Sequence, residues 1–201
     1  KFAPEKILEL CSYININGKI TKFTKQKKAE VLKINEELAK MVAMILDGSL
    51  SKNLQNCMFS QKKDKNKALE FARIIKNNFG IESRIKKGEN GCYLVNVSNK
   101  TLCYFFYKCL DIYKCDENTK IPKWIWKSEK NVKIEYLRYA FAMEGSIENP
   151  KKDKEIRFHS CDLKHTIELQ GFLEKEFKIN FKFYKYFIKD YGWKYYLCVT
   201  N

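Results

Sequence analysis

The sequence predicts an α+β fold made of two pseudo-symmetric units, each with the order αββαββ and, in the first unit, a closing helix. An apolar, helix-like run that ends in an acidic residue and a glycine occurs twice, at Asp47-Gly48 and Glu144-Gly145, with the two acids 97 residues apart. Strand-like and helix-like segments follow each copy in the same order, which indicates an internal repeat. The chain has 201 residues, of which 45% are hydrophobic, enough for one large core or two small ones.

The first unit begins with an apolar run whose periodicity predicts a helix. Two strand-like pieces, an amphipathic helix, two strands joined by the turn Gly88-Glu89-Asn90-Gly91, and a short helix follow. We expect these elements at 36–46 (helix), 56–60 (second strand-like piece), 65–79 (helix), 83–87 and 92–98 (strands) and from Thr101 (helix).

The helix predicted over 65–79 has a clear apolar pattern. Its apolar positions recur at helical spacing and are Leu69, Ala72, Ile75 and Phe79. Gly80 follows, and a glycine in the left-handed conformation commonly ends a helix.

The second unit repeats this order. We expect its elements at 134–143 (helix), 155–160 (strand), 162–177 (helix), and 181–188 and 194–200 (strands). The turn Asp190-Tyr191-Gly192 joins the last two strands. The sequence stops at Asn201, where the first unit goes on to its closing helix, so we expect the second unit to be truncated.

We divide the chain into an N-terminal extension, a first unit, a connector and a second unit, at residues 1–35, 36–118, 119–133 and 134–201. The connector contains Pro122 and two tryptophans, Trp124 and Trp126, which we expect to pack between the halves.

The N-terminal extension includes one predicted helix, Pro4–Tyr13, and a basic stretch, Lys19–Lys28. The basic stretch fits either an arm that contacts DNA or a solvated face.

The formal net charge of +15 predicts a polyanionic partner, nucleic acid above all, because lysine and arginine displace counterions from phosphates. A lysine-rich but otherwise ordinary surface is the alternative. No apolar run approaches the roughly 18 residues of a membrane span, and no apolar signal core stands at the N-terminus. We therefore expect a cytoplasmic, intracellular protein without a membrane partner.

The eight cysteines include no Cys-x-x-Cys pair, which favours structural cysteines over a zinc site. The two histidines are too few for a nitrogen-rich metal site. We assign His159 to a strand and His165 to the start of a helix.

An acidic residue at the C-terminal end of a buried helix is unusual, because the free carbonyls there are already negative. A cation stabilises a carboxylate in that place. Two such helices side by side would bring Asp47 and Glu144 to one point and create an oxygen-rich site suited to Mg²⁺. Magnesium between two carboxylates and a phosphate is an arrangement for phosphodiester hydrolysis. Gly48 and Gly145 would let the backbone turn sharply with unrestricted φ.

These motifs resemble the LAGLIDADG homing endonucleases in their single-chain, two-repeat form. The segment Leu137–Ser146 matches the signature of that family, and Leu38–Leu50 matches its first copy more loosely. The connector segment Lys120–Ile125 also resembles the inter-repeat segment of the family. The resemblance covers about residues 36 to 201.

The resemblance implies an αββαββα fold in each unit, with the two signature helices packed at the centre and saddle-shaped antiparallel sheets in the DNA major groove. It implies a monomeric, site-specific endonuclease that cuts double-stranded DNA at a long asymmetric site. Asp47 and Glu144 would be its catalytic residues and share Mg²⁺, or Mn²⁺, with Ca²⁺ able to occupy the same site.

One departure concerns the small residues of the signature helices. The family has Gly or Ala five residues and one residue before the acid, where this chain has Val42, Leu46, Tyr139 and Met143. Small residues lie four before the acid instead, at Ala43 and Ala140, which predicts either a shifted contact register or wider helix spacing.

The predicted strands supply candidate DNA-binding residues, since alternate side chains of one face would meet the groove. They are Lys52, Gln55, Arg84 and Lys86 in the first unit and Lys154, Arg157, Lys182 and Lys185 in the second. An ordinary solvated strand residue is the alternative for each. The family also has a basic residue near the scissile phosphates, for which Lys86 and Lys185 are the candidates.

Two other functions stay open. The first is a DNA- or RNA-binding protein that does not cleave, such as a regulator or an intron maturase. The second is an endonuclease excised from an intein, although Lys1 is not a splicing nucleophile and no histidine precedes Asn201.

Overall fold

The computed structural model describes residues 13–16, 19–22, 35–62, 64–88, 90–112, 119–148 and 154–200. Its helices are α3 (Glu36–Asp47), α4 (Lys65–Phe79), α5 (Lys100–Lys108), α6 (Lys123–Lys127), α7 (Lys130–Glu144) and α8 (Leu163–Phe177). The strands after α3 are β3 (Ser49–Leu50), β4 (Cys57–Gln61), β5 (Arg84–Lys87) and β6 (Tyr93–Val97). Those after α7 are β7 (Gly145–Glu148), β8 (Glu155–Ser160), β9 (Lys182–Ile188) and β10 (Gly192–Thr200).

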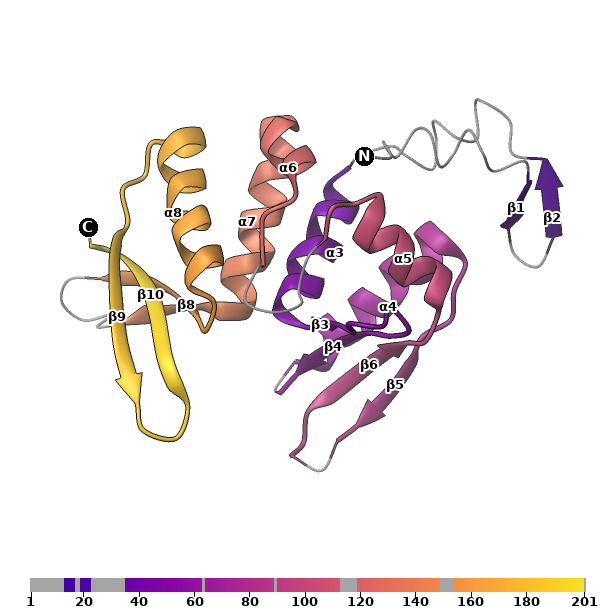
Figure 1. Cartoon of the computed structure of the whole chain (residues 1–201), viewed down its shortest axis with the longest axis horizontal. Coiled ribbons are helices and arrows are strands. Elements are labelled where there is room, and N and C mark those ends of the chain that lie inside the picture. The colour runs from indigo at the N-terminus through magenta and orange to yellow at the C-terminus, as the bar shows by residue number, and fades with distance from the viewer. Residues whose placement is uncertain are drawn as a thin grey trace.

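Each unit contains one four-stranded antiparallel sheet, and the two sheets have the same topology. The strand order is β3-β4-β6-β5 in the first and β7-β8-β10-β9 in the second. In Figure 1, α3 and α7 lie at the centre, and the hairpins β5–β6 and β9–β10 both extend away from the helices. The predicted α+β fold of two repeated units is confirmed.

The N-termini of the helices have matching caps in the two units. Asp64 Oδ1 accepts a hydrogen bond from Asn66 N at the start of α4, and Asp162 Oδ1 accepts one from His165 N at the start of α8. At the end of α4, Gly80 adopts the predicted left-handed conformation, with φ of 67°.

Two element predictions need correction. The buried residues of α4 are Ala68, Phe71, Ile74 and Ile75. Leu69, predicted to belong to the apolar side of this helix, is 45% exposed. In addition, α7 begins at Lys130 rather than at Ile134.

The N-terminal extension contains a hairpin that the sequence analysis did not predict. Strand β1 (Tyr13–Ile16) pairs antiparallel with β2 (Lys19–Lys22). The predicted helix Pro4–Tyr13 lies outside the described residues except for Tyr13, which is in β1. The basic stretch is described only as far as Lys22.

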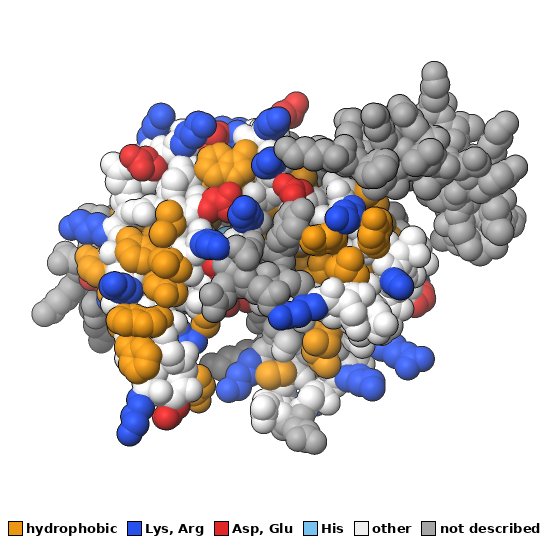
Figure 2. Space-filling view, viewed as in Figure 1, with side chains coloured by type: hydrophobic (Ala, Val, Ile, Leu, Met, Phe, Trp, Pro, Cys, Tyr) orange, Lys and Arg blue, Asp and Glu red, His pale blue; other side chains and the backbone are white. Residues whose placement is uncertain are grey.

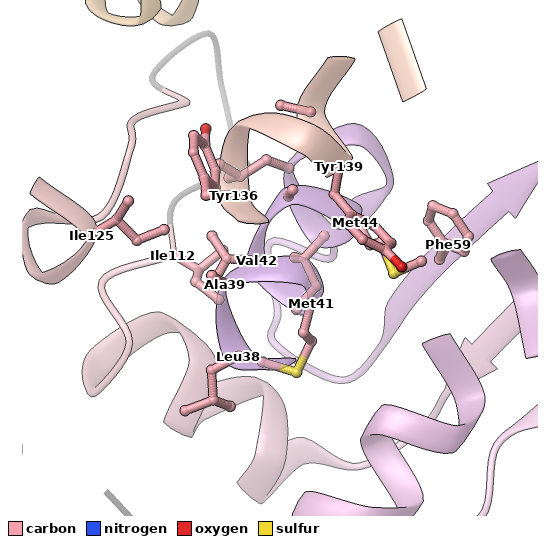
Figure 3. Close-up of a cluster of buried hydrophobic side chains, with 14 of the residues drawn as sticks. Leu38, Ala39, Met41, Val42, Met44, Phe59, Ile112, Ile125, Tyr136 and Tyr139 are labelled. Carbon is pink, nitrogen blue, oxygen red and sulfur yellow. The ribbon is translucent and has the colours of Figure 1, made fainter. Parts of the chain in front are cut away.

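Helix α3 is the centre of the hydrophobic core. It packs along α7 and also contacts α4 and β4. Met41, Val42, Met44 and Ile45 of α3 have no exposed surface. Figure 3 shows α3 side chains lying among residues of α7, β4 and the connector.

The connector packs against both units, as predicted. Trp124 Nε1 donates to Leu110 O at 2.9 Å in the first unit, while the ring of Trp126 meets Phe172 of α8 edge-on, with the centroids 4.8 Å apart.

Four of the described cysteines, Cys57, Cys103, Cys109 and Cys198, are buried as free thiols, and they fill the interior like small hydrophobic residues. Burial raises the pKa of the Cys57 thiol far above its usual value. Across the described ranges, no helix combines the length and the apolar character needed to cross a membrane.

Candidate metal centre and nucleic-acid interface

Asp47 and Glu144 are the last residues of α3 and α7, the two helices that pack together most extensively. Both carboxylates line one pocket between the helix ends. Its lining residues are Ala43, Leu46, Asp47, Tyr136, Ala140, Glu144, Phe158, Ser160 and His165. The structure therefore brings the two predicted acids together.

The ends of both helices are electrostatically suited to a cation. Neither α3 nor α7 has a basic residue of its own in its last turn, so the final carboxylate of each helix adds to the negative potential of the helix end. Asp47 is half-buried, whereas Glu144 is exposed.

Side chains from the first unit hold the last turn of α7. Lys67 Nζ of α4 donates to Ala142 O at 2.6 Å, and Gln61 Nε2 at the end of β4 lies 3.1 Å from Met143 Sδ. Both contacts are made to the two residues before Glu144. The position of this acid thus depends on the first unit as well as on its own helix.

The glycines after the acids are required for a different reason from the one predicted. Gly48 and Gly145 have φ of −72° and −87°, which do not require glycine, so the expected freedom of φ is not used. Space is limiting instead. A Cβ at Gly48 would lie 2.2 Å from Met58 O, and one at Gly145 would lie 2.3 Å from Phe141 O. A side chain at Gly48 would collide with the backbone of β4, and one at Gly145 would collide with the last turn of α7 itself.

The helix contact fits the shifted register. Ala43 and Ala140, the small residues four before each acid, are both buried and line the shared pocket. Tyr139 stands where the family has a small residue, and its hydroxyl donates a hydrogen bond to the Glu70 carboxylate of α4. Burial, and then the Glu70 carboxylate, raise the pKa of Tyr139 to about 12, so the phenol keeps its proton.

The inner wall of the pocket contains a buried pair that the sequence analysis missed. Tyr136 OH of α7 lies 3.4 Å from His165 Nε2 of α8. Burial raises the pKa of the Tyr136 phenol far above its usual value, so this wall carries a neutral hydroxyl. The helical position of His165 was predicted, but its place in the pocket depends on the packing of α8.

Lys194 is a second residue that the sequence analysis missed. Its Nζ lies 2.8 Å from Cys161 Sγ, a contact that raises the pKa of the lysine, and the charge of Glu144 raises it further. The interactions with Cys161 and with the negative charge of Glu144 both favour the charged form of this lysine on β10.

The open face of each sheet is defined here as the face turned away from the helices that cover the other face. In the first sheet, Phe59 and Val95 are buried on the helix side, so the alternating partners Arg84 and Lys86 lie on the open face. Both are exposed and line a groove with Asn96, Leu94, Glu82 and Ser98. Lys52 and Gln55 are exposed in the turn between β3 and β4.

In the second sheet, Arg157 and Lys182 both pair with Cys198 and share the open face. Lys185 lies on the opposite face, with its Nζ 5.3 Å from the Trp193 ring centroid. Lys154 is exposed and precedes β8.

The open face of the second sheet also carries a row of rings, which we call the aromatic row: His159, Tyr196 and Tyr184 on β8, β10 and β9. The rings of Tyr184 and Tyr196 stack with centroids 4.8 Å apart and planes at 11°. His159 continues the row, 5.7 Å from Tyr196.

No protein-family model matches the chain. One curated relative, glutamine–fructose-6-phosphate aminotransferase (isomerizing) of Methanocaldococcus jannaschii, is 26% identical over 204 residues. The match covers 94% of this chain, and the chain spans only 17% of the length of that protein.

Among solved structures, the chain is similar to the homing endonuclease I-DmoI in complex with DNA and Mn, with a TM-score of 0.57 at 15% identity over 84% of this chain and 91% of the other. The complex of I-DmoI with DNA and Ca gives a TM-score of 0.57 at 16% identity, over 83% of each chain. The N-terminal LAGLIDADG domain of DUF199/WhiA gives 0.52 at 14% identity, over 84% of this chain and 78% of the other. At these identities the likeness establishes the fold.

Proposed function

From the LAGLIDADG fold of this chain, we infer that it binds double-stranded DNA and cleaves it as a site-specific, metal-dependent endonuclease. Asp47 and Glu144 are the proposed catalytic residues. The observation that carries this proposal is the shared pocket, in which the final acids of two packed helices meet.

The donor set fits a hard divalent cation. Mg²⁺ prefers oxygen ligands and is commonly held by one or two carboxylates, with water and substrate phosphate completing its shell. Within the described ranges, no group of three or more His, Cys, Asp or Glu side chains could hold a metal by itself. Two acids that line one pocket fit a metal centre whose remaining ligands are water and the phosphates of bound DNA. The structurally similar I-DmoI has been solved with DNA together with Mn or Ca. A bound divalent ion would supply water activation and stabilisation of the leaving oxygen.

The remaining residues would hold the DNA around this centre. Lys194, which lies opposite Tyr186 on the open face of the second sheet, is suited to bind a phosphate, a role for which sequence analysis suggested Lys86 and Lys185. Arg84 and Lys86 on one open face and Lys182 on the other would contact the two halves of the site. Because the two open faces carry different side chains, we expect the site to be long and asymmetric, and a monomer to bind it.

The similarity to the aminotransferase does not lead us to propose amino transfer, because the match covers only 17% of that enzyme. A matching stretch of this size inside a much longer protein instead supports an origin as a segment carried by a host protein, one of the origins that the sequence left open.

The proposal is tested by incubating the chain with a plasmid pool that carries random inserts, in Mg²⁺ or Mn²⁺, and sequencing the cut ends. Asp47→Asn and Glu144→Gln should each bind DNA but lower cutting by more than about 100-fold, because loss of a group that only orients a metal ligand already costs about 10–100-fold. Glu174→Gln, at an exposed acid of α8, is the matched control and should cut normally. Unchanged cutting by Asp47→Asn or Glu144→Gln would refute the assignment.

The second candidate is a nucleic-acid-binding protein that does not cleave. The specific observation in its favour is the similarity to the LAGLIDADG domain of DUF199/WhiA, at a TM-score comparable to that of the endonuclease. If this second function is correct, the chain should bind duplex DNA but produce no cut ends in Mg²⁺ or Mn²⁺. Asp47→Asn, Glu144→Gln and Glu174→Gln should then bind DNA with equal affinity.

A further inference from the structure

The open faces of the two sheets differ in chemistry. The first presents the exposed side chains of Arg84 and Lys86, which form directional hydrogen bonds, and Asn96, whose Oδ1 is buried. The second presents the aromatic row together with Tyr186 and Ile188. These two residues follow Tyr184 at every second position of β9 and therefore lie on the same face. In Figure 2, hydrophobic side chains gather over the β9–β10 hairpin at the lower left, whereas white and blue side chains predominate over β5–β6.

The aromatic row stands on edge. Two rings lying flat and side by side would collide at a centroid distance of 4.8 Å, so Tyr184 and Tyr196 must face one another across neighbouring strands. The ring faces that they turn toward each other are covered, and their edges point outward. An unpaired base has no room to insert between them. Outward edges are suited instead to the floor of a groove in an intact duplex.

Two basic side chains of this face, Arg157 and Lys194, are engaged within the protein, whereas Lys182 is exposed at the start of β9. Lys194 Nζ lies 2.8 Å from Cys161 Sγ. Arg157 Nε donates to Glu155 Oε2 at 3.0 Å, its NH2 group binds the same oxygen, and its guanidinium lies 5.4 Å from the Tyr196 centroid. Partial burial, and then the charge of Arg157, lower the pKa of His159, which favours its neutral form. Tyr184 and Tyr186 are each 41% exposed and Ile188 is 37% exposed, so tyrosine rings and an aliphatic side chain form the accessible surface between Lys182 and the hairpin turn.

In the major groove, thymine differs from the other bases by its C5-methyl group, which makes apolar contacts, whereas arginine or lysine reads guanine and asparagine reads adenine. We propose that the second sheet recognises thymine methyl groups through Tyr184, Tyr186 and Ile188, while the first sheet reads guanine through Arg84 and Lys86. This inference rests on the proposed duplex-DNA function and specifies the sequence of its two half-sites.

The test is a binding selection from random-sequence duplex DNA in the presence of Ca²⁺, carried out with the unaltered chain, Tyr184→Ala and Arg84→Ala. Tyr184→Ala should lose base preference in one half-site, and that half-site should be rich in thymine in the selection with the unaltered chain. Arg84→Ala should lose base preference in the other half-site. Tyr184→Phe, which keeps the ring, should keep the preference.

Replacing thymidine by deoxyuridine in the selected duplex then removes only the methyl groups. We expect affinity to fall ~4-fold per contacted methyl, the factor for removing one buried methylene-sized group. The loss should occur in the second half-site alone and disappear in the double variant Tyr184→Ala/Tyr186→Ala, while Arg84→Ala should retain it.

The two possible failures are distinguishable. A selected site that tolerates deoxyuridine throughout would overturn the thymine inference and leave duplex binding intact. Failure to select any duplex sequence would overturn the proposed function, and the inference with it.

Discussion

The helices α3 and α7 occupy equivalent places in the two units, yet their surroundings differ. Eight residues of α3 are buried, against four of α7. At the same spacing of 97 residues that relates the acids, buried Met41 corresponds to Arg138, and buried Ile45 corresponds to exposed Ala142. The repeat therefore specifies the backbone path and the acid–glycine ending. Burial is decided by neighbours, because α3 also packs against α4 whereas one side of α7 faces solvent.

The largest effect that tests this comparison is expected when the two helices exchange Met41 and Arg138. Met41→Arg would place a charge at a site with no exposed surface and should remove several kcal/mol of unfolding free energy, enough to unfold a chain of ordinary stability. Arg138→Met should change stability by less than about 1 kcal/mol, because the Arg138 side chain is 62% exposed. Circular dichroism during urea unfolding measures both, and a well-folded Met41→Arg variant would contradict the burial asymmetry.

A smaller but still large effect is expected for Ile45→Ala, which gives α3 the residue that α7 has at the equivalent place. The cavity should cost about 2–5 kcal/mol. The reverse change, Ala142→Ile, adds an apolar side chain at an exposed position and should alter stability by about 0.5 kcal/mol or less. Similar urea midpoints for the two variants would show that the helices are buried alike.

The N-terminal caps of α4 and α8 also differ in the number of hydrogen bonds that they accept. Asp162 caps α8 and also accepts a hydrogen bond from Thr119 N at 3.0 Å, whereas its counterpart Asp64 is a cap for α4. We expect Asp162→Ala to cost about 2 kcal/mol and Asp64→Ala about 1 kcal/mol, within the range for capping residues. Equal urea midpoints for these variants would mean that the link to the connector contributes nothing.

The cap at Asp162 also makes a prediction about pH. Burial alone would raise the pKa of Asp162, but the hydrogen bonds from His165 N and Thr119 N outweigh it and hold the pKa below the usual value of 3.8. Because the folded pKa is the lower one, the extra stability is present above about pH 4 and is lost as the pH falls through the depressed value. The stability difference between the unaltered chain and Asp162→Asn should therefore shrink between pH 5 and pH 3, as measured by urea unfolding.

The smallest expected effect has the opposite sign. Gly171 lies inside α8 with open space where a Cβ would be, and Arg73 occupies the equivalent position in α4. Gly171→Ala should stabilise the chain by about 0.5–1 kcal/mol. Gly192→Ala is the contrasting control, because φ of 72° disfavours a side chain there, and it should destabilise. A destabilised Gly171→Ala variant would mean that α8 requires a glycine.

The elements of both units could be predicted because periodicity, caps and turns agree along the sequence. Helix α4 has the predicted bounds, and Gly80 ends it as expected. The buried side was misplaced at Leu69, since Phe71 and Ile74 give an equally good helical stripe and only packing against the sheet selects between them. The hairpin β1–β2 was missed although Asn17-Gly18, a strong hairpin signal, stands between the two strands.

The candidate site was predictable only in part. The repeat places Asp47 and Glu144 at equivalent helix ends, and packing of those helices follows from their apolar character. Lys194 could not be found, because its place opposite Tyr186 depends on how β10 pairs with β9. Lys182 and Lys185, in contrast, are three positions apart on one strand, and strand alternation alone puts them on opposite faces.

The contacts of Gln61 and Lys67 with the last turn of α7 limit how freely one half of the chain can be combined with a different partner half. A hybrid protein that joined this second half to a foreign first half would contain the complete helix α7 but lack the two side chains that contact its last turn. Any exchange of halves, by natural gene fusion or by design, therefore has to keep Gln61 and Lys67 in the new first half or replace them with residues that make equivalent contacts.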